Sequence, residues 1–218
     1  DHRREHHGVT ARRGLIVACA AALTAAACAP RAPSLIGSVA PVRIPAAALP
    51  PGYHKLVFDF AYKDPDFSLK GDGAARVASP DSMRLDFFVN NEAAGDAVLI
   101  GDTLRAANPS VARKLLPPVP FFWAALGVLR VPASPDTAAR VDGDTLRIEI
   151  GTRPAWRATF MGTELLRLDL IDDGRIPQTV MRVPGAPVRF RDFRAHRTLD
   201  ITVRGTDTVP PFDAAIWH

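Results

Sequence analysis

Apolar and polar side chains alternate with a period of two through most of the chain from Tyr53 onward. Leu166, Leu168 and Leu170, for example, are separated by Arg167 and Asp169. Because successive side chains of a strand point to opposite faces of a sheet, this pattern predicts strands with one apolar and one polar face. Polar turns separate roughly ten such segments, which favours a large, strongly curved antiparallel sheet with an apolar concave side.

One apolar segment breaks this alternation. Residues 120–129 are apolar on nearly all sides, and Pro117, Pro118 and Pro120 surround its start. This composition predicts a helix that is buried on most of its faces. We therefore expect a mainly β (α+β) fold, in which one apolar helix plugs the open side of an incomplete barrel.

The N-terminal residues have the pattern of a targeting segment. Arg12 and Arg13 precede an uncharged stretch, residues 14–27, which as a helix would be only ~21 Å long, too short for a bilayer core of ~30 Å. This pattern predicts a signal peptide over residues 1–27, with a buried helix or an ordinary cleaved signal as alternatives.

The end of this segment, Ala25-Ala26-Ala27-Cys28, resembles the lipobox of bacterial lipoproteins. In those proteins the cysteine thiol receives a diacylglycerol and becomes the first residue of the mature chain. The resemblance implies lipidation of Cys28 and a membrane anchor. Ala29 stands where an aspartate marks inner-membrane retention in enterobacteria, so the implied location is the outer membrane, facing the periplasm.

Residues 28–52 separate this anchor from the alternating segments of residues 53–218. Prolines at positions 30, 33, 41, 45, 50 and 51 disfavour helix and sheet pairing. We expect an extended tether that holds the domain away from the membrane. The alternative is an edge strand near residues 39–44.

Charge and cysteine usage exclude several classes of protein. Residues 28–218 contain 23 basic and 21 acidic side chains, without a basic stripe interleaved with aromatic residues, so no nucleic-acid partner is expected. Cys19 lies in the leader and Cys28 is the predicted lipid site, so we expect no disulfide in the mature chain. A domain of this size buries enough surface to fold without one.

Motifs of the common enzyme classes are also missing. The sequence contains no G-x-S-x-G elbow and no phosphate-binding glycine loop. Beyond the leader, the histidines are His54, His196 and His218, whose spacing suggests neither a metal site nor a triad. We expect a protein that is not an enzyme and uses no cofactor or metal. A hydrolase that uses His196 with Asp192 or Asp200 remains an alternative.

Several features occur in the order in which they occur in the LolA/LolB lipoprotein-localisation family. A lipidated cysteine and a proline-rich tether are followed by a G-x-G step, a strand ending in two asparagines, a Pro-flanked apolar helix and a strand that opens with tryptophan. The residues concerned are Gly71, Gly73, Asn90, Asn91, Trp123, Gly127, Trp156, Pro177 and Pro187. The chain resembles this family over residues 53–204. The resemblance implies an incompletely closed barrel of eleven strands, with helices plugging its mouth and a cavity that receives the acyl chains of lipoproteins.

An acyl-chain site needs aliphatic and aromatic walls and few polar groups. Apolar residues on the inward positions of the predicted strands and helix are candidates for these walls, although each could instead pack in a solid core. The candidates are Leu56, Phe58, Phe60, Met83, Leu85, Phe87, Leu99, Trp123, Leu126, Ile148, Phe160 and Leu168.

One segment departs from the family. In LolB, a loop after the third strand carries an exposed apolar residue that enters the membrane, whereas residues 90–96 here are polar apart from Ala93, Ala94 and Gly95. Burying an alanine methyl contributes about 0.8 kcal/mol, against about 1.5–3 kcal/mol for a leucine side chain. This difference argues against membrane delivery through that loop.

We therefore expect a monomeric, lipid-anchored envelope protein that binds acyl chains or a similar hydrophobic ligand, with a role in lipoprotein sorting. The alternative is a non-catalytic scaffold lipoprotein with a solid core and an envelope protein as partner. For the apolar tail, residues 209–218, two roles are open. Trp217 could dock on a partner, or the tail could fold back on its own domain.

Overall fold

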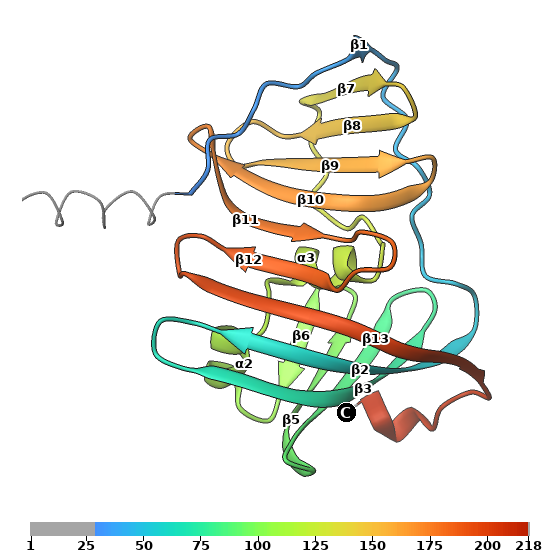
Figure 1. Ribbon diagram of the computed structural model, residues 1–218. Helices are drawn as coiled ribbons and strands as arrows, with labels where there is room; N and C mark the ends of the chain where they lie inside the picture. Colours follow the sequence, from blue (N-terminus) through green and yellow to red (C-terminus); the bar gives the residue numbers. More distant parts are fainter. Residues whose placement is uncertain (1–28, 218) are drawn as a thin grey trace, which may run out of the picture.

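The chain folds into one antiparallel sheet of thirteen strands in the computed structural model, which describes residues 29–217. The sheet is strongly curved, and within the described residues its two edge strands, β1 and β6, do not pair with each other (Figure 1). The predicted mainly β, incompletely closed architecture is confirmed, with thirteen strands instead of about eleven. The predicted signal peptide, Cys28 and His218 lie outside the described residues.

The strands follow the sheet order β1-β7-β8-β9-β10-β11-β12-β13-β2-β3-β4-β5-β6. Their bounds are β1 Ser38–Val39, β2 Tyr53–Lys63, β3 Ser68–Ala78, β4 Ser82–Val89, β5 Glu92–Ile100, β6 Thr103–Ala106, β7 Thr137–Asp142, β8 Thr145–Ile150, β9 Ala155–Met161, β10 Glu164–Asp172, β11 Arg175–Met181, β12 Val188–Asp192 and β13 Arg197–Val209. The helices are α2 Pro109–Leu115, α3 Val119–Ala125 and the short 3₁₀ helix η1 Ala214–Trp217.

Two meanders, β2–β6 and β7–β13, are joined by the pairing of β13 with β2. This pairing extends from Thr198 opposite Lys63 to Val209 opposite Tyr53. It joins the last strand of the chain to the first long one, so neither meander ends in a free edge at the centre of the sheet. Both helices lie on the same side of the sheet, α3 behind β11 and β12 and α2 behind β2 and β3 (Figure 1).

Two phenylalanine rings of β2 lie against the glycines of the G-x-G step in β3. Phe60 lies opposite Gly71, and Phe58 lies opposite Gly73. A Cβ atom at Gly71 would lie 2.9 Å from the Phe60 ring, and one at Gly73 would lie still closer to the Phe58 ring. Only glycine leaves room for these rings at this step.

Helix α3 is the centre of the main core. The side chains of Phe121, Trp123 and Ala124 are fully buried, and the Trp123 indole Nε1 donates a hydrogen bond of 2.8 Å to the Gly101 carbonyl oxygen. The helix ends at Ala125, so its predicted extension to Leu129 is wrong. Gly127 adopts a left-handed φ of +86°, which ends the helix.

The polar segment 90–96 is a tight hairpin instead of a loop. Asn90 and Asn91 both have positive φ values, 52° and 65°, and form a two-residue turn between β4 and β5. Asparagine tolerates this conformation better than most residues. Strand β5 therefore starts at Glu92, within this polar segment.

Residues 29–52 are extended and lie along the domain. Ile176 N–H donates to the Pro30 carbonyl oxygen (2.8 Å), Ser38–Val39 pair with β7, and Leu49 is buried. An edge strand is present as β1, but it shares only Val39 with the predicted range of residues 39–44. The boundary at residue 52 itself stays a prediction.

The C-terminal tail folds back on its own domain. Arg84 Nη1 in β4 donates to the Ile216 carbonyl oxygen (3.1 Å), and the Phe212 ring packs edge-on against Tyr53 and Trp217. Of the two roles open for the tail, the structure therefore shows the fold-back.

Candidate hydrophobic binding site

An apolar pocket of about 240 Å³ lies between α2 and the concave face of β2–β5. Aromatic rings of β2 and β4 form its floor, and aliphatic side chains of α2 form its roof. It is lined by Phe60, Tyr62, Leu69, Phe87, Ala94, Gly95, Asp96, Ala106, Ala107, Asn108, Val111, Ala112, Leu115, Leu116 and Leu199. Since Asp96 is its one charged residue, the pocket suits a hydrocarbon better than a polar ligand.

Hydrogen bonds hold helix α2 in place at both of its ends. At the N-terminus, the Asn108 side-chain oxygen accepts a hydrogen bond of 3.2 Å from Val111 N–H. At the C-terminus, Arg197 donates to the carbonyl oxygens of Arg113 and Lys114, and the Tyr62 hydroxyl oxygen lies 3.3 Å from that of Lys114. These donors satisfy carbonyl groups that the end of a helix leaves without partners.

The Tyr62 hydroxyl and the Asp64 carboxylate form a hydrogen-bonded pair beside the C-terminal end of α2. Burial beside Asp64 raises the pKa of Tyr62 to about 12. Burial opposes ionisation of Asp64, yet hydrogen bonds from Phe67 N–H (2.8 Å), Asp66 N–H (2.9 Å) and the Tyr62 hydroxyl (3.0 Å) hold its pKa below the usual value. Tyr62 is therefore a neutral donor and Asp64 a charged acceptor throughout the neutral pH range.

A second apolar pocket, of about 60 Å³, lies under α3. It is lined by Leu56, Phe58, Ala75, Met83, Leu85, Phe87, Phe122, Ala125, Leu126, Val188, Leu199, Ile201 and Val203. Phe87 and Leu199 line both pockets and lie between them. The Phe87 ring meets the rings of Phe58 and Phe60 edge-on, at centroid distances of 5.9 and 5.4 Å. This aromatic group is the partition between the two pockets.

The predicted wall residues divide into two groups. Seven line a pocket, and these are Leu56, Phe58, Phe60, Met83, Leu85, Phe87 and Leu126. Five line neither pocket and are at most 1% exposed, namely Leu99, Trp123, Ile148, Phe160 and Leu168. The first group lies on β2, β4 and the end of α3, whereas most of the second lies on β8, β9 and β10. The structure therefore brings together the candidates of one half of the sheet.

Sequence reasoning missed the roof of the larger pocket. Helix α2 covers it, while α3, the helix predicted to plug the sheet, covers the smaller one. A signal for α2 was present, because Asn108-Pro109 is an N-cap residue followed by proline in the first turn. Its seven residues and their mixed composition made it inconspicuous beside the apolar segment that follows.

The two aspartates of the hydrolase alternative are paired with residues other than His196. Asp192 accepts hydrogen bonds from Gln178 and Arg197, and Asp200 pairs with Arg189 at 3.0 Å. His196 is exposed in the turn between β12 and β13. Across residues 29–217, no three His, Cys, Asp or Glu side chains form a group that could hold a metal ion, and no helix is long and apolar enough to cross a membrane.

Comparison with known proteins agrees with this architecture. No protein-family model and no curated protein matches the sequence. A LolA superfamily protein from Nitrosomonas europaea has a similar solved structure, with a TM-score of 0.50 and 11% identity over 79% of this chain and 92% of that chain.

Two further solved structures align with lower scores. A DUF1329 family protein from Desulfovibrio piger has a TM-score of 0.43, at 10% identity over 77% of this chain and 90% of that chain. A domain described as an outer membrane lipoprotein-sorting protein domain, from Vibrio parahaemolyticus, has a TM-score of 0.41, at 6% identity over 76% and 89%. On its sheet topology and its likeness to the first of these structures, the protein has the fold of the LolA superfamily.

Proposed function

We propose that this protein is a lipid-anchored component of the cell envelope that binds acyl chains or a similar hydrophobic ligand and acts in lipoprotein sorting. The observation that carries the proposal is the apolar pocket beneath α2. The LolA superfamily fold supports it, because the name of that superfamily refers to lipoprotein localisation. Lipidation of Cys28, with the domain facing the periplasm from the outer membrane, belongs to the same proposal.

The size of the larger pocket sets what it can hold. Its volume of about 240 Å³ exceeds the ~150 Å³ cavity that accepts benzene in an engineered protein core, and is below the ~300–1,000 Å³ of drug-sized sites. A short stretch of one hydrocarbon chain fits without rearrangement. A longer chain requires α2 to lift from the sheet or the aromatic partition to move.

No catalytic step is needed for this function. Binding exchanges water-exposed methylene groups for contact with Phe60, Phe87 and Leu115, at about 0.8 kcal/mol for each buried CH₂ group. The ligand would remain chemically unchanged. Uptake and release then depend on how readily the roof of the pocket opens.

The test uses residues on the rim of the larger pocket. Leu69 and Leu115 are half-buried and line it, so an arginine there can reach water while its stem fills the pocket. Leu69→Arg and Leu115→Arg should abolish uptake of a fluorescent fatty acid by the purified protein. Met161→Arg, at an exposed position outside both pockets, is the control and should bind like the wild type.

Unfolding curves in urea accompany each titration. Both rim variants should retain a cooperative transition, which shows that lost uptake is not lost folding. Folded rim variants that take up the fatty acid as well as the control does would refute the pocket as the binding site.

A scaffold protein is the second candidate function. The tight packing of Ile148, Phe160 and Leu168, all fully buried, favours it, because this half of the interior is solid. A scaffold would bind no fatty acid at any concentration, so the same titration separates the two candidates.

A further inference from the structure

The described chain begins on the surface of the domain, at the turn between β10 and β11. Arg175 Nη1 donates to the Ala29 carbonyl oxygen (3.0 Å), and Ala32 N–H donates to the Gly174 carbonyl oxygen (2.8 Å). Ala32 also packs on a small separate cluster formed by Ala155, Ile171 and Ile176, together with Phe193. The segment that follows Cys28 is therefore docked on the domain, and a lipid on Cys28 would lie one residue, ~3.8 Å between Cα atoms, from this docked segment.

Several turns meet at this end of the sheet. The loop between β8 and β9, the turn between β10 and β11, and the turn between β12 and β13 lie at the same ends of neighbouring antiparallel strands. The turn between β2 and β3 is there too, because Lys63 lies opposite Thr198. We call this the anchor end, defined by residues 29–32, 63–67, 151–154, 172–175, 193–197 and α2.

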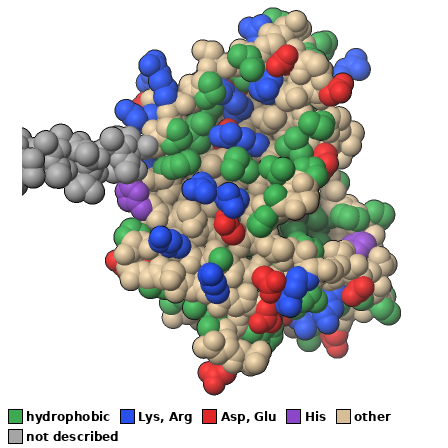
Figure 2. Space-filling model, viewed as in Figure 1, with side chains coloured by type: hydrophobic (Ala, Val, Ile, Leu, Met, Phe, Trp, Pro, Cys, Tyr) green, Lys and Arg blue, Asp and Glu red, His purple; other side chains and the backbone are tan. Residues whose placement is uncertain are grey.

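Exposed cations outnumber exposed anions at the anchor end. The cations are Arg31, Lys63, Arg113, Lys114, Arg153, Arg175 and Arg194, and the exposed acids are Asp66 and Asp173. Asp172 is half-buried and paired with Arg194 at 2.5 Å, and Lys114 lies 3.2 Å from Asp66. Figure 2 shows basic side chains on the left-hand part of the molecule, around the point where the described chain begins. The anchor end therefore carries a net positive charge.

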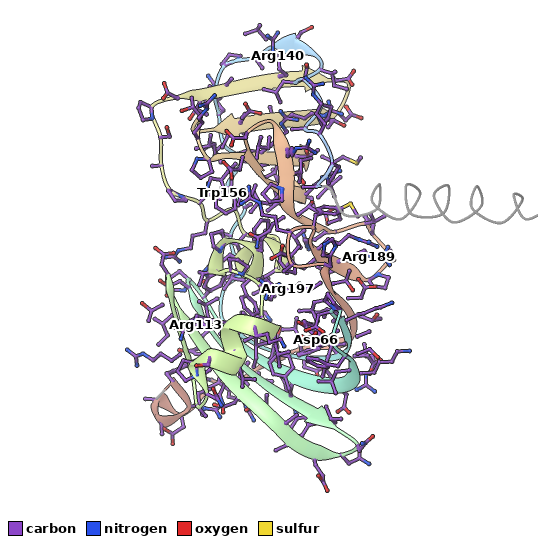
Figure 3. The ribbon with its side chains drawn as sticks, turned by 90° about the vertical axis from the view of Figure 1, so that its left-hand side faces the viewer. Asp66, Arg113, Arg140, Trp156, Arg189 and Arg197 are labelled. Carbon is purple, nitrogen blue, oxygen red and sulfur yellow. The ribbon has the colours of Figure 1, made fainter. Side chains whose placement is uncertain are left out.

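The roof of the larger pocket faces the same side. Arg197, at the first position of β13, donates to the carbonyl groups at the end of α2. In the view onto this side, α2 is seen with Arg113, Arg197 and Asp66 around it (Figure 3). Tyr62 and Leu69, which line the pocket, flank the turn between β2 and β3. The docked start of the chain and the pocket roof thus share one end of the molecule.

We propose that the anchor end is a docking surface for an anionic lipid membrane, so that α2 and the larger pocket face the bilayer that holds the protein. This orientation rests on the proposed lipidation of Cys28. The place where the described chain begins and the complementary charge both select a membrane as the partner. A docked segment in place of a free tether keeps the cations within a Debye length, ~8–10 Å, of the headgroups.

The orientation can be measured on the full lipidated protein in phosphatidylcholine vesicles with and without phosphatidylglycerol. A fluorescent label is placed at Ala195→Cys, in the turn between β12 and β13 at the anchor end, or at Ala186→Cys, in the exposed turn at the opposite end of β12. A quencher attached to lipid headgroups should quench the label at 195 and leave the label at 186 bright in vesicles with phosphatidylglycerol. Equal quenching of the two labels would overturn the proposal.

Charge variants test the cause of this orientation. The attraction of an anionic membrane falls about fivefold for each basic residue removed from its surface. The double variant Arg31→Glu with Arg194→Glu should therefore lose the difference between the two labels. The control, Arg43→Glu with Lys55→Glu, changes two exposed cations outside the anchor end and should keep it. A control that loses the difference as fully as the test variant would also contradict the proposal.

Mass spectrometry of the same protein separates this proposal from the proposed function. Protein without lipid on Cys28 overturns the proposed anchoring and, with it, the orientation. Lipidated protein whose labels are quenched equally overturns the orientation alone. Fatty-acid uptake, measured separately, decides the binding function in either case.

Discussion

Phe87 partitions the two apolar pockets, so its truncation should change ligand binding and stability in opposite directions. The two pockets together measure about 300 Å³, and Phe87 lines both of them. Phe87→Ala removes the ring between them and joins them into one cavity. The joined volume then lies within the ~300–1,000 Å³ range of sites for drug-sized ligands.

The loss of stability can be estimated from the surroundings of this ring. Truncation of a buried phenylalanine to alanine costs about 3–5 kcal/mol of unfolding free energy. Phe87 is half-buried and already borders empty space, but it also packs edge-on against Phe58 and Phe60. We expect a loss near the lower end, about 3 kcal/mol, measured by urea unfolding.

The binding assay compares fluorescent fatty acids of short and long chain length. Phe87→Ala should bind the long chain more tightly than the wild type does, because the joined cavity accommodates methylene groups that otherwise stay in water at about 0.8 kcal/mol each. The short chain already fits and should change little. Leu168→Ala, in the solid part of the core, is the matched control, which should lose about 2–5 kcal/mol of stability without a gain in binding.

If long-chain affinity falls in Phe87→Ala in proportion to its loss of stability, as in the Leu168→Ala control, the two pockets do not act as parts of one site. The ring would then be an ordinary core residue.

Further predictions concern the sheet and the attachment of α2. Gly73→Ala should destabilise the protein by about 1–3 kcal/mol in urea unfolding, because a Cβ there meets the Phe58 ring and the Asp86 carbonyl oxygen; an unchanged midpoint would argue against the close approach. Arg197→Ala should speed amide hydrogen exchange in α2, residues 109–115, with smaller changes in β9 and β10, since it removes donors to the Arg113 and Lys114 carbonyl groups; uniform acceleration would indicate a global effect. The pKa of Asp64 is lowered in the folded protein, so the stability that Asp64 contributes is complete above its usual pKa and is lost as the pH falls through its pKa in the folded state. The acid limb of the stability curve should therefore flatten in Asp64→Asn. The pKa of Tyr62 is raised to about 12, so the stability that Tyr62 contributes is complete below its usual pKa of ~10 and is lost as the pH rises toward 12. Tyr62→Phe should remove this loss of stability at alkaline pH. An unchanged alkaline limb of the stability curve would count against the attachment of α2 through Tyr62.

The sequence was sufficient for the fold because the alternation of inward and outward residues is strong. Leu166 to Leu170 in β10 and Met83 to Val89 in β4 alternate so regularly that their faces could be assigned without the structure. The G-x-G step, which the sequence shares with the LolA/LolB family, is where the Phe58 and Phe60 rings lie against the glycines of β3. These features depend on local geometry, which the sequence encodes directly.

The candidate site was less accessible to sequence reasoning. Leu85 and Leu168 have the same local pattern, yet Leu85 lines a pocket while Leu168 is packed solid. What separates them is the distance between the sheet and the helix above it, which depends on contacts between residues far apart in the chain. Helix α2 went unnoticed for a related reason, since its attachment depends on Arg197, more than eighty residues away.

The proposed function requires that a hydrocarbon chain enters the pocket beneath α2. The most direct measurement is photo-crosslinking of the full-length protein with a fatty acid that carries a photoreactive group near its methyl end, followed by mapping of the labelled residues by mass spectrometry. We predict labelling in α2, residues 109–115, and in the facing parts of β2 and β4, with competition by unlabelled fatty acid. Labelling confined to exposed residues, or labelling that unlabelled fatty acid does not reduce, would contradict binding in this pocket.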